Sequence, residues 1–255
     1  MSNVHLVIPD QHAHPDHDNV RADWLSRLIV DVRPDVVVNI GDAADLPSLS
    51  QIDKGKVPFQ GRSYKKDIDS HCDFQDRVWG PVVSRKKKLP RRIFLHGNHE
   101  QRIQQAINRT PELSETIGFN DLRLSEWYDE IVPYQGVTPG VIQVDGISYS
   151  HFFSAGISGR PVGGEHTGYS LLGKLYSSAT MGHSHLFDLC IRTRGDGSKI
   201  VGCSAGCYQD YTNDWAGELG KLWDRGILVC HNVEAGSYDP QWISIDAIRK
   251  EYGTT

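Results

Sequence analysis

Three short segments of the chain each end in side chains that can bind a metal or move a proton. Residues 4–8, 36–40 and 93–95 are mostly apolar and rich in β-branched residues, which is typical of strands buried on both faces of a parallel sheet. Such sheets bind ligands beyond the carboxyl ends of their strands. The sequence therefore predicts that one sheet edge carries the polar groups that follow these segments: Asp10, His12, Asp42, Asn98 and His99.

Helical patterns separate the three segments, as an α/β fold requires. Apolar residues recur at spacings of three and four over residues 20–32, and Pro34 ends that pattern. A second helix is expected from about residue 64 to 89, with a break or kink at Gly80-Pro81. A third helix is expected over residues 101–107.

The second half of the chain changes to patterns typical of antiparallel strands. Turn signals at Asp145-Gly146 and Gly195-Asp196-Gly197 predict two hairpins, and residues 226–245 predict a third. A glycine-rich loop over 152–165 and a helix over 169–179 lie between the first two. Alternating strands and helices followed by runs of strands indicate two sheets packed face to face.

Composition limits the class of protein. With 38% hydrophobic and 23% charged residues, the 255-residue chain is typical of a soluble globular protein, and we expect one domain over 1–255 with insertions at about 46–76 and 108–135. The net charge of −5 gives no overall cationic field that would attract nucleic acid, although a local basic patch could still attract it. Five cysteines without a C-x-x-C pair, and no signal-peptide or membrane-spanning pattern, predict a cytoplasmic protein with reduced thiols and no membrane contact.

Histidines in the second half complete a candidate metal site. His151 follows a predicted strand, and His183 and His185 follow a glycine. A single histidine is ordinarily a core or surface residue, but here several occur together at strand ends with carboxylates. Mixed imidazole and carboxylate ligands suit divalent manganese, iron or zinc. Seven candidates are too many for one ion and suit two ions that share a carboxylate, as in phosphate ester hydrolysis: Asp10, His12, Asp42, Asn98, His151, His183 and His185.

The motifs that carry these residues resemble, in the same order, those of the calcineurin-like metallophosphoesterases. They are Asp10-Gln11-His12, Gly41-Asp42-Ala43-Ala44-Asp45, Gly97-Asn98-His99-Glu100, His151 and Gly182-His183-Ser184-His185. The resemblance spans roughly residues 5–190. It implies a four-layer α/β/β/α sandwich of two packed mixed sheets flanked by helices. It also implies two divalent metal ions as cofactors, Mn²⁺ in the first place, with Fe, Zn, Co, Ni or Mg as alternatives.

The resemblance also assigns roles to single residues. It assigns Asp10, His12 and His185 to one metal, and Asn98, His151 and His183 to the other. Asp42 would bind both metals. His99 is then catalytic rather than a ligand and lies over the scissile phosphate, while Asp45 holds the far nitrogen of its ring. The mechanism expected on this basis is in-line attack by a metal-bridging hydroxide, with His99 stabilising charge or protonating the leaving oxygen.

The substrate is less constrained. Protein Ser/Thr phosphatases of this family carry an arginine directly after the second aspartate of the G-D-x-x-D motif, whereas this chain has Leu46. The Ala44-Asp45 ending instead resembles the cyclic-nucleotide phosphodiesterase and nuclease branches. We therefore expect a phosphodiesterase acting on DNA, RNA or a nucleotide. The alternatives are a phosphoprotein or small-molecule phosphomonoesterase and, third, a non-catalytic metal-binding scaffold.

Three further features leave alternatives open. Basic residues in 54–66 and 85–92 could follow a nucleic-acid backbone or could be solvated surface. Residues 203–223 could form a lid or an edge loop. Several aromatic residues could stack on bases or belong to the core: Trp127, Tyr128, Tyr208, Tyr211 and Trp215.

Overall fold

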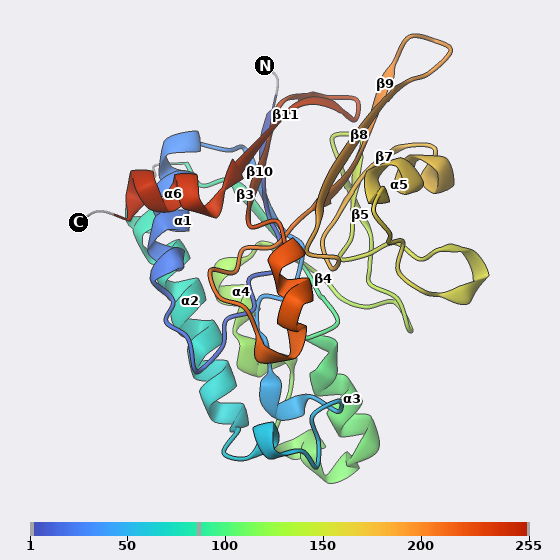
Figure 1. The fold of residues 1–255 in the computed structure, drawn as a ribbon. Coiled ribbons are helices and arrows are strands. Elements are labelled where there is room, and N and C mark those ends of the chain that lie inside the picture. Colours follow the sequence, from blue (N-terminus) through green and yellow to red (C-terminus); the bar gives the residue numbers. More distant parts are fainter. Residues whose placement is uncertain (1–2, 86–87, 254–255) are drawn as a thin grey trace.

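Two β-sheets lie between two layers of helices (Figure 1). The computed structural model describes residues 3–85 and 88–253, without the side chains of residues 214 and 215. In spatial order, the first sheet consists of β11 (Ser237–Ser244), β10 (Gly226–Glu234), β1 (Asn3–Ile8), β2 (Val36–Asn39), β3 (Arg91–Leu95) and β4 (Glu130–Val132). The second consists of β5 (Ile142–Val144), β6 (Ile147–Tyr149), β7 (Ser178–Met181), β9 (Lys199–Ala205) and β8 (Phe187–Thr193).

The helices cover the outer face of each sheet. On the first sheet these are α1 (Val20–Val32), α2 (Tyr64–Arg85) and α6 (Ile245–Tyr252), and on the second sheet α5 (Thr167–Leu175). The short helices α3 (Gln101–Arg109) and α4 (Leu124–Trp127) follow β3 and precede β4. The predicted α/β/β/α sandwich of two mixed sheets is confirmed. None of the helices in the described residues is long and apolar enough to cross a membrane.

The alternation of side chains along β1 separates the two halves of the core. Leu6 and Ile8 pack with the helices on the outer face, whereas Val7 packs between the two sheets with residues such as Tyr149. All three β1 residues are at most 1% exposed. Full burial of such a side chain contributes about 1.5–3 kcal/mol. A strand with both faces buried must be continuously apolar, which explains the run at residues 6–8.

Parallel pairing aligns the carboxyl ends of three strands. Ile8 pairs with Asn39 in β2, and Asn39 pairs with Phe94 in β3. The loops that follow β1, β2 and β3 therefore leave the first sheet at one edge. This is the arrangement that the sequence predicted for the polar groups after these strands.

Several expected boundaries were wrong. The helix expected over 169–179 is α5, which ends at Leu175; Tyr176 then takes a left-handed conformation and Ser178 opens β7. Helix α2 continues through Gly80-Pro81 to Arg85, and residues 86–87 of the expected helix lie outside the described residues.

The second half of the chain does not form a purely antiparallel second sheet. The C-terminal hairpin β10–β11 joins the first sheet, because β10 pairs antiparallel with β1. In the second sheet, β6, β7 and β9 pair in parallel. The edge strand β4 and the terminal helix α6 were not predicted at all.

Candidate metal centre

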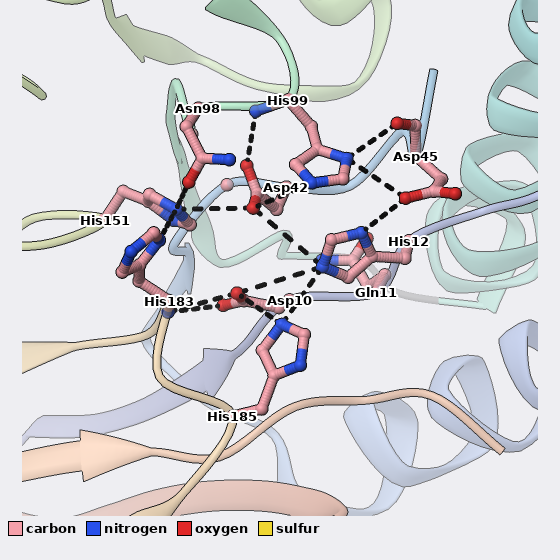
Figure 2. Close-up of polar contacts among 12 residues, drawn as sticks. Asp10, Gln11, His12, Asp42, Asp45, Asn98, His99, His151, His183 and His185 are labelled. Carbon is pink, nitrogen blue, oxygen red and sulfur yellow. Dashed lines mark hydrogen bonds and ion pairs between the residues drawn. The ribbon is translucent and has the colours of Figure 1, made fainter. Parts of the chain in front are cut away.

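The candidate ligands from both sheets meet in one cluster (Figure 2). The first sheet supplies residues from the loops after β1, β2 and β3, and the second supplies residues after β6 and β7. The cluster includes every ligand that the sequence predicted: Asp10, His12, Asp42, Asn98, His151, His183 and His185.

The cluster contains three groups of three side chains that could hold an ion, and two of these groups share no residue with each other. In each group the three ligand atoms all lie within 4.8 Å of one another. The first group is Asp10, His12 and His185, and the second is Asp42, His151 and His183. Asn98 adds an amide oxygen 2.9 Å from Nε2 of His151. This grouping coincides with the division between two metals that the family resemblance implies.

Distances between ligand atoms test whether the cluster fits metal ions. Nε2 of His12 lies 3.2 Å from Nε2 of His185, and Nδ1 of His183 lies 3.2 Å from Nε2 of His151. Bonds from zinc to nitrogen of about 2.0–2.1 Å place two nitrogens on one ion roughly 3.0–3.4 Å apart. Both imidazole pairs therefore have the separation of ligands that share an ion, and the residues fit two metals.

The electrostatics of the cluster favour cations. Burial alone would raise the pKa of Asp42, but the imidazole of His151 beside it holds that pKa well below the usual range. Burial would lower the pKa of His151, but the charge of Asp42 raises it to about 9. The two buried carboxylates Asp10 and Asp42 thus draw positive charge to the site, in the form of a protonated imidazole or a metal ion.

Four of the candidate ligands sit on backbone turns that side chains rarely adopt. Their φ angles are +46° at His12, +48° at Asp42, +67° at His183 and +58° at His185. A non-glycine residue in the left-handed region costs free energy and persists where the surrounding structure enforces it. The turns project ligands from separate loops toward a common centre, which regular strand ends would not do.

Glu100 holds two of these loops together. Its buried carboxylate accepts hydrogen bonds from the backbone N–H groups of Asp42 and Ala43 at 2.9 Å, Ala44 at 3.2 Å and Gly97 at 2.8 Å. One side chain therefore fixes the loop after β2 against the loop after β3. The sequence showed Glu100 as part of a motif but gave no sign of this role. The role depends on hydrogen bonds to residues up to 58 positions earlier in the chain.

Asp45 holds the rings of two histidines. Its Oδ1 atom lies 2.9 Å from Nδ1 of His12 and 3.0 Å from Nδ1 of His99. The backbone oxygen of Asp45 also accepts from His99 Nδ1 at 2.6 Å. Both rings consequently turn their Nε2 atoms toward Asp42, at 3.8 Å for His12 and 3.9 Å for His99. His99 could also join His12 and Asp42 in holding an ion, so its role as a non-ligand remains a prediction.

Arg102 is a site residue that the sequence reasoning missed. Its guanidinium donates to the backbone oxygen of Asp45 at 2.8 Å, and a second nitrogen lies 2.9 Å from Nε2 of His99. The signal was present in the sequence, because Arg102 is three residues beyond His99 at the start of a predicted helix. In the structure the backbone N–H of Arg102 donates to the backbone oxygen of His99 at 3.0 Å, so the turn at the start of the helix brings the two residues together.

A cavity of about 560 Å³ opens over the cluster. Asp42, Asn98, His99 and His183 line it on the side of the candidate ligands. Cationic side chains also line the wall: Lys56, Arg62 and Arg102. Positive charge beside a metal-ligand cluster suits an anionic substrate.

The structure also bears on several aromatic and basic residues for which the sequence left two interpretations open. Trp127, Tyr128 and Tyr208 are at most 5% exposed and belong to the core, so they are not free to stack on bases. Trp215 is among the residues whose side chains are not described. Arg91 and Arg92 lie at the amino end of β3, opposite the metal-ligand edge, and bind Glu130 and Asp129.

Comparison with solved structures finds 36 chains that match, one of which is the following. A solved structure of a conserved uncharacterized protein from Streptococcus pneumoniae TIGR4, described as a predicted phosphoesterase, matches with a TM-score of 0.34 and 12% sequence identity. The match covers 95% of this chain and 99% of that one. No protein-family model matches the chain, and no curated protein matches it.

Proposed function

We propose that the protein is a dinuclear metal-dependent phosphoester hydrolase that acts on phosphodiester bonds of nucleotides or nucleic acids. The observation that carries this proposal is the pair of three-residue groups within one cluster, each with ligand atoms no more than 4.8 Å apart. The order of the motifs along the chain, which resembles that of the calcineurin-like metallophosphoesterases, supports the same reaction class.

The donor set determines what each ion would do. Asp10, His12 and His185 would hold one ion, and His151, His183 and Asn98 the other, with Asp42 shared. Two divalent cations at this position supply Lewis-acid chemistry, which neutralises phosphoryl oxygens and makes water a stronger nucleophile near neutral pH. The mixture of nitrogen and oxygen donors supports Mn²⁺, Fe or Zn over an ion that prefers oxygen alone.

His99 and Arg102 act on the substrate from the side of the cavity opposite the second sheet. Arginine can only donate hydrogen bonds, so Nε2 of His99 accepts from Arg102 and Nδ1 carries the proton that binds Asp45. When a phosphoryl group enters, Arg102 turns its donors to the phosphoryl oxygens. Nε2 of His99 is then free to take up a proton from water and to deliver it to the leaving oxygen.

Arg102 also gives weight to the alternative of a phosphomonoesterase. The absence of an arginine after Asp45 argued against a monoester, because a guanidinium is suited to grip a phosphate dianion. Arg102, in helix α3, brings a guanidinium to the backbone oxygen of Asp45, next to the position that Leu46 occupies. The diester remains the preferred substrate, because a cavity of about 560 Å³ has room for a second ester group, with Lys56 and Arg62 in its wall.

The test begins with metal analysis of the purified protein and then compares two small substrates. With Mn²⁺ added, bis(4-nitrophenyl) phosphate should be hydrolysed faster than 4-nitrophenyl phosphate, and chelation should abolish both activities. Single- and double-stranded DNA are then tried as substrates. A wide preference for the monoester would replace the diesterase proposal with the phosphatase alternative, and bound metal without any hydrolysis would favour a scaffold.

A further inference from the structure

A second cavity adjoins the metal-ligand cavity. Its volume is about 660 Å³, within the usual range for small-molecule sites. The two cavities share His14, Pro47, Asp53, Arg62 and Asn213 in their walls. The second cavity therefore begins where the first one ends, on the side away from the second sheet's histidines.

His14 connects the second cavity to the candidate catalytic residues. Its Nε2 lies 3.6 Å from Oδ2 of Asp45, the carboxylate that also holds His12 and His99. A group joined by an ester bond to a phosphorus atom beside His99 would extend past Asp45 toward His14. The second cavity is thus placed to receive one of the groups that a phosphodiester carries.

One ring of a stacked aromatic pair, His17, lines the second cavity. The rings of His17 and Tyr211 stack with centroids 3.8 Å apart and planes 13° apart, and His17 is exposed and belongs to the cavity wall. Arg21 lies over the Tyr211 ring, 5.4 Å from its centroid. The Tyr211 hydroxyl donates to the backbone oxygen of His12 at 2.5 Å. His17 is therefore held flat against a braced ring, with its imidazole at the cavity surface.

Charged groups of both signs complete the lining of the second cavity. Lys66 is exposed at the wall, and Arg62 lies beside it with its guanidinium 2.8 Å from Asp53. Asp16 is the other acid of the lining. A lining with a flat aromatic ring, one exposed cation and hydrogen-bonding carboxylates suits a planar heterocycle with polar edges attached to a phosphate.

We infer that this cavity is a nucleoside subsite in which the base of a nucleotide diester stacks on His17 while its phosphate lies at the metal centre. The inference rests on the proposed function for the phosphate, and adds the chemical class of one ester group. Lys66 binds either the next phosphate of a nucleic-acid substrate or the edge of the sugar. Stacking of a base on an aromatic side chain contributes enough affinity to change binding about tenfold or more.

The activity test uses two diesters that differ only in one ester group. Thymidine 5′-(4-nitrophenyl phosphate) presents a nucleoside, and bis(4-nitrophenyl) phosphate does not. The substitution His17→Ala should lower kcat/KM for the thymidine substrate about tenfold and change that for the bis-aryl substrate less than twofold. His17→Phe, which preserves a stacking ring, should restore the preference. His166→Ala, at an exposed histidine outside both cavities, should affect neither substrate.

A binding test separates failure of the subsite from failure of the proposed function. Metal-free protein is titrated with thymidine 5′-monophosphate and, separately, with inorganic phosphate. The nucleotide should bind more tightly than phosphate, and His17→Ala should remove that difference even if the wild-type protein hydrolyses nothing. Equal effects of His17→Ala on both diesters, or equal binding of both probes, would overturn the subsite and leave the metal-centre proposal intact. A phosphotyrosine peptide that is hydrolysed faster than the thymidine diester, with the same dependence on His17, would overturn it in favour of peptide substrates.

Discussion

A guanidinium nitrogen of Arg102 lies 2.9 Å from Nε2 of His99, on the side of the ring that faces Asp42. Because arginine does not accept hydrogen bonds, the contact selects the His99 tautomer whose proton is on Nδ1. Asp45 favours the same tautomer, since both its backbone oxygen and its carboxylate lie near Nδ1. The candidate catalytic histidine is therefore oriented from both ends by residues that do not belong to the predicted ligand set.

The first prediction concerns Arg102. Replacement by lysine keeps a positive charge but removes the fork of donors that reaches Asp45 and His99 together. We expect kcat/KM for bis(4-nitrophenyl) phosphate to fall about tenfold for Arg102→Lys and about 100-fold for Arg102→Ala. Metal content should not change. Arg109→Lys, at an exposed position of the same helix, is the control and should behave as wild type.

The second prediction separates the roles of Asp42 and His99. Asp42 belongs to the second three-residue group, and its Oδ2 lies 3.8 Å from Nε2 of His12 in the first, so Asp42→Ala should lose bound metal and activity together. His99→Ala should keep two metals per chain and lose turnover by roughly 100-fold or more, which is the usual contribution of a placed proton donor. Atomic emission and steady-state rates measure the two quantities. Loss of metal in His99→Ala would make His99 a ligand, and an unchanged rate would remove it from the mechanism.

The third prediction concerns the shared carboxylate oxygen of Asp45. Although burial alone would raise the pKa of Asp45, its hydrogen bonds to His12 and His99 hold that pKa well below the usual range. Asp45→Asn keeps the size of the side chain and removes the charge that orients both rings. Loss of such a partner typically costs 10–100-fold in metal affinity or activity, and we expect a loss of about that size in both. Titration calorimetry with Mn²⁺ gives the affinity, and Asp246→Asn on the surface of α6 is the control. Unchanged affinity would mean that His12 does not depend on Asp45.

The sequence predicted the sheet edge because parallel strands impose it. Strands that are buried on both faces need continuous apolar runs, and those runs end where the polar loops begin, as at Ile8 and Leu95. Local pattern is sufficient for this inference. The local pattern does not predict which sheet the C-terminal hairpin joins, because the apolar face of β10 would look the same in either sheet. Only the pairing of β10 with β1 assigns the hairpin to the first sheet.

The missed residues of the site share a different cause. Glu100 and Arg102 act through backbone groups of the loop at residues 42–46, which lies more than 50 positions away in the chain. A motif shows that such residues occur, but not which distant N–H or carbonyl group they reach. The boundary of α5 was missed for a more local reason: Tyr176 adopts a left-handed conformation that glycine or asparagine more often marks.

The fourth prediction concerns the close approach of Gly182 to Asp10. A methyl group at Gly182 would overlap with Oδ1 of Asp10, which also accepts a hydrogen bond from the backbone of His183. Gly182→Ala should therefore displace a candidate ligand and weaken metal binding at least tenfold. Gly173→Ala is the matched control, because a methyl group there meets no neighbour and lies within helix α5. The control should keep its metal and gain about 0.5–1 kcal/mol in unfolding free energy. Equal metal binding by both variants would contradict the proposed position of Asp10.

The fifth prediction is an acid-sensitive contribution to stability from His71, which lies in α2 away from the metal centre. Burial lowers the pKa of His71 to about 4, and its Nε2 lies 3.2 Å from the backbone oxygen of Leu122. Between pH 6.5 and 4 the unfolded chain binds more protons at this residue than the folded chain, so the contribution of His71 to the free energy of unfolding falls as the pH falls. At about 1.4 kcal/mol per pKa unit, the contribution is on the order of 3 kcal/mol.

Urea unfolding in the presence of a chelator, repeated at several pH values in this window, measures the slope without a contribution from metal loss. His71→Gln keeps a donor for the Leu122 oxygen and has no titrating group, so the fall in unfolding free energy between pH 6.5 and 4 should become shallower. His96, whose pKa burial also lowers to about 4, leaves part of the slope in place. His166→Gln, at an exposed position, should retain the full slope. Equal slopes for His71→Gln and wild type would mean that His71 takes up its proton before the chain unfolds.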